Sequence, residues 1–119
     1  MTLIIDTSDS KYLKVAREGF SFIKTPALFK QSEKLLPAIV KLLNKENLNI
    51  SNIKKIKVAS SGDSFTALRV GLLTANTLAY ALDLPIESLG DQKNQVLKIK
   101  GLNIIKAQYR SEPNIGQKK

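Results

Sequence analysis

The sequence predicts an α/β fold, in which two main helices cover a mixed sheet with a hairpin at its edge. Three observations carry this prediction. Short β-rich runs open the chain, two long helical stretches follow, and a further β-rich run comes after each helix. The order strand, strand, strand, helix, strand, helix, strand is typical of a sheet with crossover helices.

The first three strands are predicted from a short apolar run and a turn signal. Residues 3–5 are apolar and Asp6 closes the run, which is typical of a buried strand that ends in a polar loop. Residues 11–17 and 20–25 are β-rich and lie on either side of Gly19, which can take the positive φ of a tight turn. We therefore expect three adjacent antiparallel strands.

The first helix is predicted to begin at Phe29 or Ser32 and to end near Asn47. Ser32 is a plausible N-cap, and Glu33 suits the positive end of the helix dipole. Pro37 lies too deep for a first turn that starts at Ser32, so we expect a kink or an earlier start. One sheet contact needs roughly three apolar positions per two turns, and this helix has more. They are Leu35, Leu36, Ile39, Val40, Leu42 and Leu43.

Further elements alternate along the second half of the chain. We expect a strand over residues 55–59, a turn over 60–63, a helix over 64–82, a strand over 85–89, a turn over 90–94 and a β-rich run over 96–105. The polar and basic residues 108–119 are typical of a loose tail. A chain of 119 residues has room for one compact domain.

The helix over residues 64–82 is apolar on every side, and Arg69 is its one charged residue. Because a small domain lacks the material to cover such a helix all round, we expect a partner to cover the rest. Gly71 and three alanines recur every four positions, a spacing that lets another helix approach closely. A core helix enclosed by its own chain is the alternative. Arg69 could meet a partner's carboxylate or a phosphate, or tie back to Asp6 or Asp63.

The composition excludes most reaction chemistry. The chain has no cysteine and no histidine, so it lacks a thiolate nucleophile, a Ser-His or Cys-His pair and the commonest metal ligand. The carboxylates are scattered and form no acid–base pair. Residues 6–8 and 61–64 could be mistaken for metal or phosphate loops, but capping and turn roles explain them better. We expect no catalytic residue, no cofactor and no metal.

Charge and hydropathy indicate which partners and which cellular location to expect. The formal net charge of +9 favours acidic partners such as RNA, an anionic membrane or an acidic protein, and an evenly solvated lysine-rich surface is the alternative. No apolar window approaches the roughly 18 to 20 residues that cross a membrane, and the first residues do not match a signal peptide. We expect a cytoplasmic protein.

Three motifs occur in order and together resemble one family. They are residues 3–8 (Leu-Ile-Ile-Asp-Thr-Ser), 31–37 (Gln-Ser-Glu-Lys-Leu-Leu-Pro) and 64–71 (Ser-Phe-Thr-Ala-Leu-Arg-Val-Gly). The first is similar to the opening strand of the TsaB (YeaZ) family of tRNA threonylcarbamoyladenosine biosynthesis. The others resemble that family's His-Ser-Glu-x-Leu-Leu-Pro and Gly-Pro-Gly-Ser-Phe-Thr-Gly-Leu-Arg-Ile-Gly.

The resemblance covers about residues 2–90 and continues more weakly over residues 106–115. It implies that residues 1–90 form the N-terminal subdomain and that residues 91–119 are a remnant of the second subdomain with a basic tail. Some positions depart from the family pattern: residues 61–63 replace Gly-Pro-Gly, Ala67 replaces Gly, Asn76 replaces Lys and Gln31 replaces His. These departures concern the loop near a nucleotide and leave the helical surface unaffected.

The resemblance implies an actin/Hsp70-like (ASKHA, RNase H-like) half-fold and a non-catalytic role in tRNA modification at position 37. Members of the family pair with TsaD, the catalytic subunit, through two helices, and the ATPase TsaE joins them. In this chain the corresponding partner-binding residues would lie among Leu36, Ile39, Val40, Leu43, Leu68, Arg69, Leu72, Ala75 and Ala79. A homodimer is compatible with the same helices, and contact with tRNA would be indirect or weak.

Two other functions remain open at this point. A basic RNA-binding or self-associating module without a TsaD partner would bind tRNA alone with a steep salt dependence. A hydrolase is the third hypothesis, because relatives were once thought to be glycoproteases. The lack of histidine and cysteine disfavours it.

Overall fold

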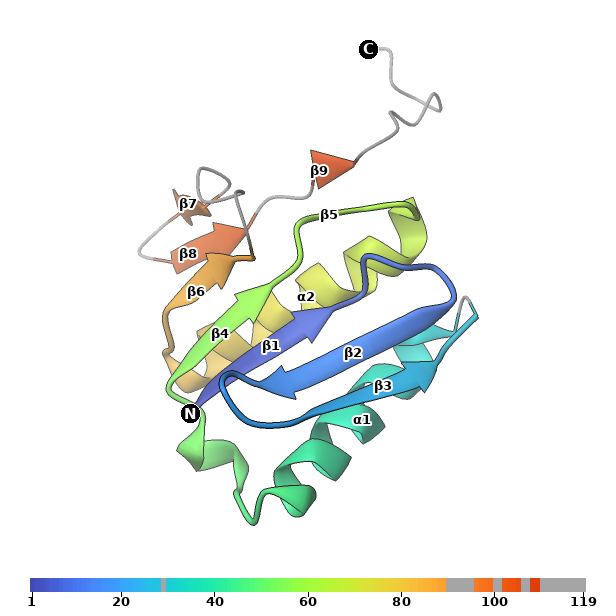
Figure 1. Cartoon of the computed structure of the whole chain (residues 1–119). Coiled ribbons are helices and arrows are strands. Elements are labelled where there is room, and N and C mark those ends of the chain that lie inside the picture. Colours follow the sequence, from blue (N-terminus) through green and yellow to red (C-terminus); the bar gives the residue numbers. More distant parts are fainter. Residues whose placement is uncertain (29, 90–95, 100–101, 106–107, 110–119) are drawn as a thin grey trace.

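The computed structural model in Figure 1 describes residues 1–28, 30–89, 96–99, 102–105 and 108–109. Its first elements are β1 (Thr2–Asp6), β2 (Tyr12–Arg17), β3 (Phe22–Pro26), α1 (Gln31–Lys45), the 3-10 turn η1 (Ile50–Asn52) and β4 (Lys55–Val58). The chain continues with β5 (Ser61–Gly62), α2 (Phe65–Leu82), β6 (Ile86–Ser88), β7 (Val96–Ile99), β8 (Leu102–Ile105) and β9 (Gln108–Tyr109).

The main sheet has five strands in the order β3-β2-β1-β4-β6. β1 pairs antiparallel with β2 and β2 pairs antiparallel with β3, whereas β4 runs parallel to both β1 and β6. Leu3 lies opposite Ile56, and Ile56 lies opposite Ile86, so the central register is set by apolar residues. The predicted mixed sheet with a hairpin edge is confirmed. Gly19 has a φ of 82° in the turn between β2 and β3, as the sequence predicted.

Both helices lie on the same face of the sheet (Figure 1). Alternate side chains of the strands point toward them and are buried, as the strand period of two requires. The core between the helices and the sheet includes Leu3, Ile5, Leu13, Val15, Leu35, Leu42, Ile56, Val58 and Leu68. The outer face of the sheet carries polar and aromatic side chains, among them Tyr12, Lys14, Phe22 and Lys24.

The start of α1 differs from the prediction. The helix begins at Gln31, Lys30 precedes it without a side-chain cap, and Ser32 lies inside the first turn. The N-cap assigned to Ser32 is therefore wrong. The physical reason is a tertiary contact, because the buried Gln31 amide donates to the Ser10 carbonyl at 2.9 Å and fixes the first turn against a loop. Pro37 lies inside the helix. The observed start at Gln31 falls between the two predicted starts, Phe29 and Ser32.

The predicted limits of α2 are confirmed. Ser64 is the N-cap, and its hydroxyl accepts a hydrogen bond from the Ala67 N–H at 3.1 Å. The helix ends at Leu82, where Asp83 takes a left-handed conformation with a φ of 56°. Pro85 lies just beyond and cannot continue a helix.

The last part of the chain corrects two expectations. β9 pairs in parallel with β5, so Ser61–Gly62 is more than a turn and Gln108–Tyr109 is not part of a loose tail. Strands of two residues are too short for a periodic pattern to reveal them. β7 and β8 pair antiparallel and confirm the β-rich run. The predicted turn over residues 90–94 and the tail over residues 110–119 lie outside the described residues.

Candidate functional site

The structure divides the predicted partner-binding residues into two groups. Leu36, Val40 and Arg69 are exposed. The other six side chains are buried among the chain's own core residues, and they are Ile39, Leu43, Leu68, Leu72, Ala75 and Ala79. The exposed part of the predicted set is therefore limited to three positions on the outer faces of the two helices.

The small-residue face of α2 packs against its own chain. Ala67, Gly71, Ala75 and Ala79 are all buried. A Cβ added at Gly71 would lie 2.3 Å from the Thr7 hydroxyl oxygen, far inside van der Waals contact. The glycine therefore lets α2 approach the end of β1, and the stripe that was expected to admit another helix is occupied within this chain.

The opposite face of α2 is exposed and carries large apolar side chains beside polar ones. Leu73 is 70% exposed and Tyr80 is 68% exposed, and Phe65 lies on the same face near the start of the helix. Sequence analysis missed these three residues as contact candidates. The signal that could have found them is their helical position opposite the small-residue stripe.

α1 also leaves apolar side chains uncovered. Leu36 and Val40 lie one helical turn apart, and each is 55% exposed. The prediction that the apolar arc of this helix is too wide for one contact is confirmed. We refer to Leu36, Val40, Phe65, Leu73 and Tyr80 as the outer helix positions.

Arg69 extends the outer face of α2 with a charge. Its guanidinium lies over the Phe65 ring, 5.3 Å from the ring centroid. Asp6 accepts hydrogen bonds from the Ser8 N–H and hydroxyl, and Asp63 accepts one from the Ser10 N–H. Among the described residues no ion pair ties Arg69 to either aspartate.

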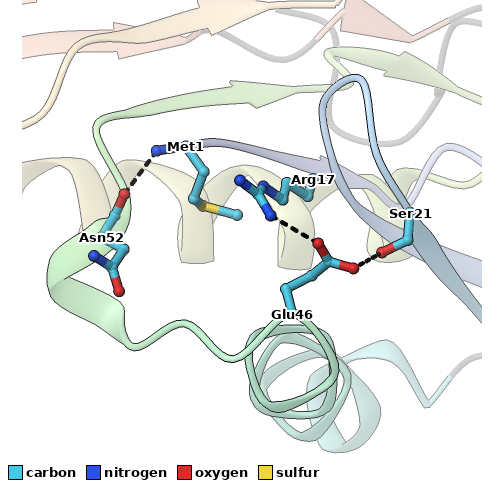
Figure 2. A network of polar contacts seen from close by, with 5 residues as sticks. All are labelled: Met1, Arg17, Ser21, Glu46 and Asn52. Carbon is cyan, nitrogen blue, oxygen red and sulfur yellow. Dashed lines mark hydrogen bonds and ion pairs between the residues drawn. The ribbon is translucent and has the colours of Figure 1, made fainter.

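A polar network holds the end of α1 against the hairpin. The Glu46 carboxylate, at the C-terminus of α1, accepts from the Arg17 guanidinium at 2.8 Å and from the Ser21 hydroxyl at 2.5 Å (Figure 2). These two donors, Ser21 first and Arg17 second, hold the pKa of Glu46 below its usual value. The same view shows the Met1 ammonium donating to the Asn52 carbonyl. The first contact fixes the end of α1 against the hairpin, and the second joins the start of the chain to η1.

The two loops that resembled ligand sites have structural roles. The Asp6 carboxylate closes a turn with Ser8, and Ser64 caps α2. A Cβ at Gly62 would lie 2.7 Å from the Ser8 backbone, so the two loops are in close contact. Within the described residues no group of three or more acidic side chains is placed to hold a metal ion. In the same part of the chain, no helix combines the length and the apolar character needed to cross a membrane.

Comparison with known proteins identifies relatives of the segment that contains α1 and α2. A family model described as TsaD, tRNA N6-adenosine threonylcarbamoyltransferase, matches residues 26–89, which is more than half of the chain. The chain belongs to this family. It is 38% identical over 58 residues to TsaB, a tRNA threonylcarbamoyladenosine biosynthesis protein of Bacillus subtilis (strain 168). The predicted likeness to the TsaB (YeaZ) family is confirmed.

Solved structures of the family share the fold. YeaZ from Pseudomonas aeruginosa superposes with a TM-score of 0.65 at 26% identity, and covers 76% of this chain. A second Pseudomonas aeruginosa structure, described as similar to the peptidase YeaZ, gives 0.63 at 24% identity over the same share. The predicted actin-like fold class is confirmed. This chain spans 25% of the Bacillus relative and 43% of each YeaZ structure.

Proposed function

We propose that this chain is a non-catalytic partner of a TsaD-type threonylcarbamoyltransferase in tRNA threonylcarbamoyladenosine biosynthesis. It binds that partner through the outer helix positions of α1 and α2. Membership of the TsaD family and similarity to TsaB of Bacillus subtilis support the pathway. On this proposal the protein acts in the cytoplasm, where the transferase modifies tRNA.

The exposed apolar side chains of the two helices carry the proposal. Large contiguous apolar patches are uncommon on soluble monomers and mark interaction sites. α1 and α2 pack against each other on one face of the sheet, so their exposed apolar side chains lie on neighbouring elements. Complete burial of a fully exposed apolar side chain is worth roughly 1.5–3 kcal/mol, and covering these partly exposed ones is worth a fraction of that. A few of them can therefore support a specific complex once the cost of association has been met.

The described side chains support a scaffold role more than a catalytic one. Asp6, Asp63 and Glu46 are engaged in turns or ion pairs, and the sequence supplies no histidine or cysteine to act as base or nucleophile. A scaffold needs a complementary surface, and the outer helix positions supply one.

The proposal is tested by co-purification with the TsaD homologue of the same genome. Leu73→Glu and Tyr80→Glu together put two charges on the outer face of α2 without touching the core. We expect the double variant to bind at least about tenfold more weakly, because the carboxylates must be desolvated in an apolar contact.

Tyr12→Glu with Phe22→Glu is the matched control, because it places the same two charges at exposed aromatic positions on the outer face of the sheet, away from α1 and α2. We expect this variant to bind the partner normally. If the α2 double variant is folded by circular dichroism and binds as tightly as the wild type, the proposed contact is wrong.

The same surface suggests how the chain behaves alone and in a larger complex. Without a partner, the outer helix positions are expected to form a homodimer, because an exposed apolar patch is complementary to its own copy. Size-exclusion chromatography with light scattering tests this at several concentrations. The same proposal includes a TsaE-like ATPase as a further member of the complex. It also assigns residues 1–90 to the N-terminal subdomain and residues 91–119 to a remnant of the second subdomain.

A further inference from the structure

The outer face of the sheet, which the proposed function does not use, carries a groove over the hairpin. The groove has a volume of about 340 Å³, and its lining includes Asp6, Asp9, Tyr12, Lys14, Phe22 and Lys24. We call it the hairpin groove. Its strand residues Tyr12, Lys14, Phe22 and Lys24 alternate with buried core residues, so they lie on the face of the sheet away from the core. Figure 1 shows α1 and α2 together on the other face.

Charges form a row across the hairpin groove. Asp6 in β1 lies opposite Lys14 in β2, and Lys14 lies opposite Lys24 in β3. Two lysines that face each other directly across a strand pair repel, which costs stability unless an anion lies between them. The pair therefore forms a place where one phosphate could be shared by two ammonium groups.

The other lysines of this face are already neutralised. Lys55 pairs with Glu87, and Lys57 pairs with Glu18. Within the described part of the chain no carboxylate forms an ion pair with Lys14 or Lys24. Lys14 and Lys24 are thus the lysines of this sheet face that form no ion pair among the described residues, and they share the hairpin groove with the Asp6 and Asp9 carboxylates.

Aromatic rings flank the lysine pair on both sides. Tyr12 precedes Lys14 by two residues in β2, and Phe22 precedes Lys24 by two residues in β3, so all four side chains point to the same face. The Lys14 ammonium lies 4.7 Å from the Phe22 ring centroid, and the Lys24 ammonium lies 4.9 Å from that of Tyr12. Both rings are exposed. A lysine that turns to a phosphate therefore frees a ring face for a base.

We propose that the hairpin groove binds single-stranded RNA. Lysines that track the backbone beside exposed rings that stack on bases, all on an open sheet, form a recurrent single-strand surface. The Asp6 and Asp9 carboxylates at the loop end accept hydrogen bonds from backbone or hydroxyl groups of their own turns. Their oxygens can still accept a hydrogen bond from a base amino group or a ribose hydroxyl. RNA carries both of these donors, whereas inorganic phosphate carries neither.

The test is fluorescence anisotropy of the full chain with a labelled oligoribonucleotide of about ten unpaired nucleotides. The variant Lys14→Ala with Lys24→Ala is expected to bind about tenfold more weakly, and its log–log salt dependence should be flatter by about 1.4. Tyr12→Ala with Phe22→Ala should lose about tenfold or more with the salt slope kept. The lysine variant removes a repulsive pair, so it should fold even where the aromatic variant does not.

Two control variants make the result specific. Lys34→Ala with Lys41→Ala removes the same charge from the exposed surface of α1, and Leu73→Glu with Tyr80→Glu alters only the proposed partner surface. The α1 lysine control should bind RNA within about twofold of the wild type. If it loses as much affinity as the groove variant, net charge alone explains binding and the proposal is overturned.

Competition identifies the ligand class. Adenosine monophosphate and inorganic phosphate should displace the oligonucleotide only weakly, and a fully paired RNA of the same length should bind less tightly than the single strand. The proposal is overturned if either small anion competes as well per phosphate as the RNA does, or if the wild type binds no RNA. Neither outcome bears on the partner contact of the outer helix positions. That contact is tested separately, by co-purification.

Discussion

At the residue scale, the contact between Thr7 and Gly71 determines how closely α2 approaches the sheet. Thr7 is fully buried, and its hydroxyl oxygen has no hydrogen-bond partner among the described residues. The hydroxyl lies where a side chain at position 71 would begin. A larger residue at either position would therefore push α2 away from the sheet.

Gly71→Ala is expected to destabilise the fold by about 1–3 kcal/mol although alanine favours helices, because its Cβ would overlap the Thr7 hydroxyl. In a Thr7→Ala background the same change should cost at least about 1 kcal/mol less, since the atom it meets is gone. Urea unfolding of the four proteins measures the coupling. Strictly additive effects would contradict the contact.

Glu46 illustrates how a carboxylate at an unfavourable place is stabilised. It lies at the C-terminus of α1, where the helix dipole disfavours negative charge. The Ser21 hydroxyl and the Arg17 guanidinium compensate and lower its pKa from the usual value of 4.5. A group whose pKa is lowered by folding stabilises the fold above its unfolded pKa, and this stabilisation is lost as the pH falls through the folded pKa.

Glu46→Gln should therefore be less stable than the wild type at about pH 7, and the gap should close as the pH falls to about 3. Ser21→Ala removes one of the two donors and should show a smaller gap with the same pH dependence. Thermal unfolding across this range provides the measurement. A gap that is constant with pH would show that the carboxylate charge has no part in stability.

At the scale of elements, the capping of α2 is a local interaction that can be tested alone. Ser64→Ala removes the oxygen that satisfies the Ala67 N–H and should cost about 1 kcal/mol of unfolding free energy. Ser64→Asp should keep the cap and add a favourable charge at the positive end of the helix. Thr66→Ala, two residues further on and exposed, is the control and should change little. A Ser64→Ala variant as stable as the wild type would contradict the cap.

The sequence predicted most elements because their signals are local. Strand alternation, Gly19 in the hairpin turn and the Ser64 cap can each be recognised within a few residues. The start of α1 was missed because it depends on the Gln31 side chain reaching a distant loop. The pairing of β5 with β9 joins two-residue strands far apart in the chain, and no local pattern marks it.

The exposed side of α2 was missed for a different reason. A helix that is apolar all round has no periodic contrast, so the pattern shows that it must be covered but not which face its own sheet covers. The small residues carry the missing information, but their spacing was interpreted as admitting another helix. They mark the side that closes on Thr7, and they leave Leu73 and Tyr80 on the opposite side.

At the scale of the whole molecule, the two faces differ in chemistry. The helix side presents large apolar residues, whereas the outer sheet face presents lysines and aromatic rings over the hairpin. Salt should therefore act in opposite directions on homodimer formation through the outer helix positions and on RNA binding at the hairpin groove. It screens repulsion between copies of a chain with a net charge of +9, and it weakens binding to RNA.

The central claim is that a partner buries the outer helix positions. Because the chain has no cysteine, Leu73→Cys introduces a single thiol whose reaction rate with a maleimide reports its exposure. Phe22→Cys places the same thiol on the outer sheet face as the matched control. Adding the TsaD homologue in excess should slow labelling of Leu73→Cys by about tenfold and leave Phe22→Cys unchanged. Equal labelling of Leu73→Cys with and without a bound partner would contradict the account.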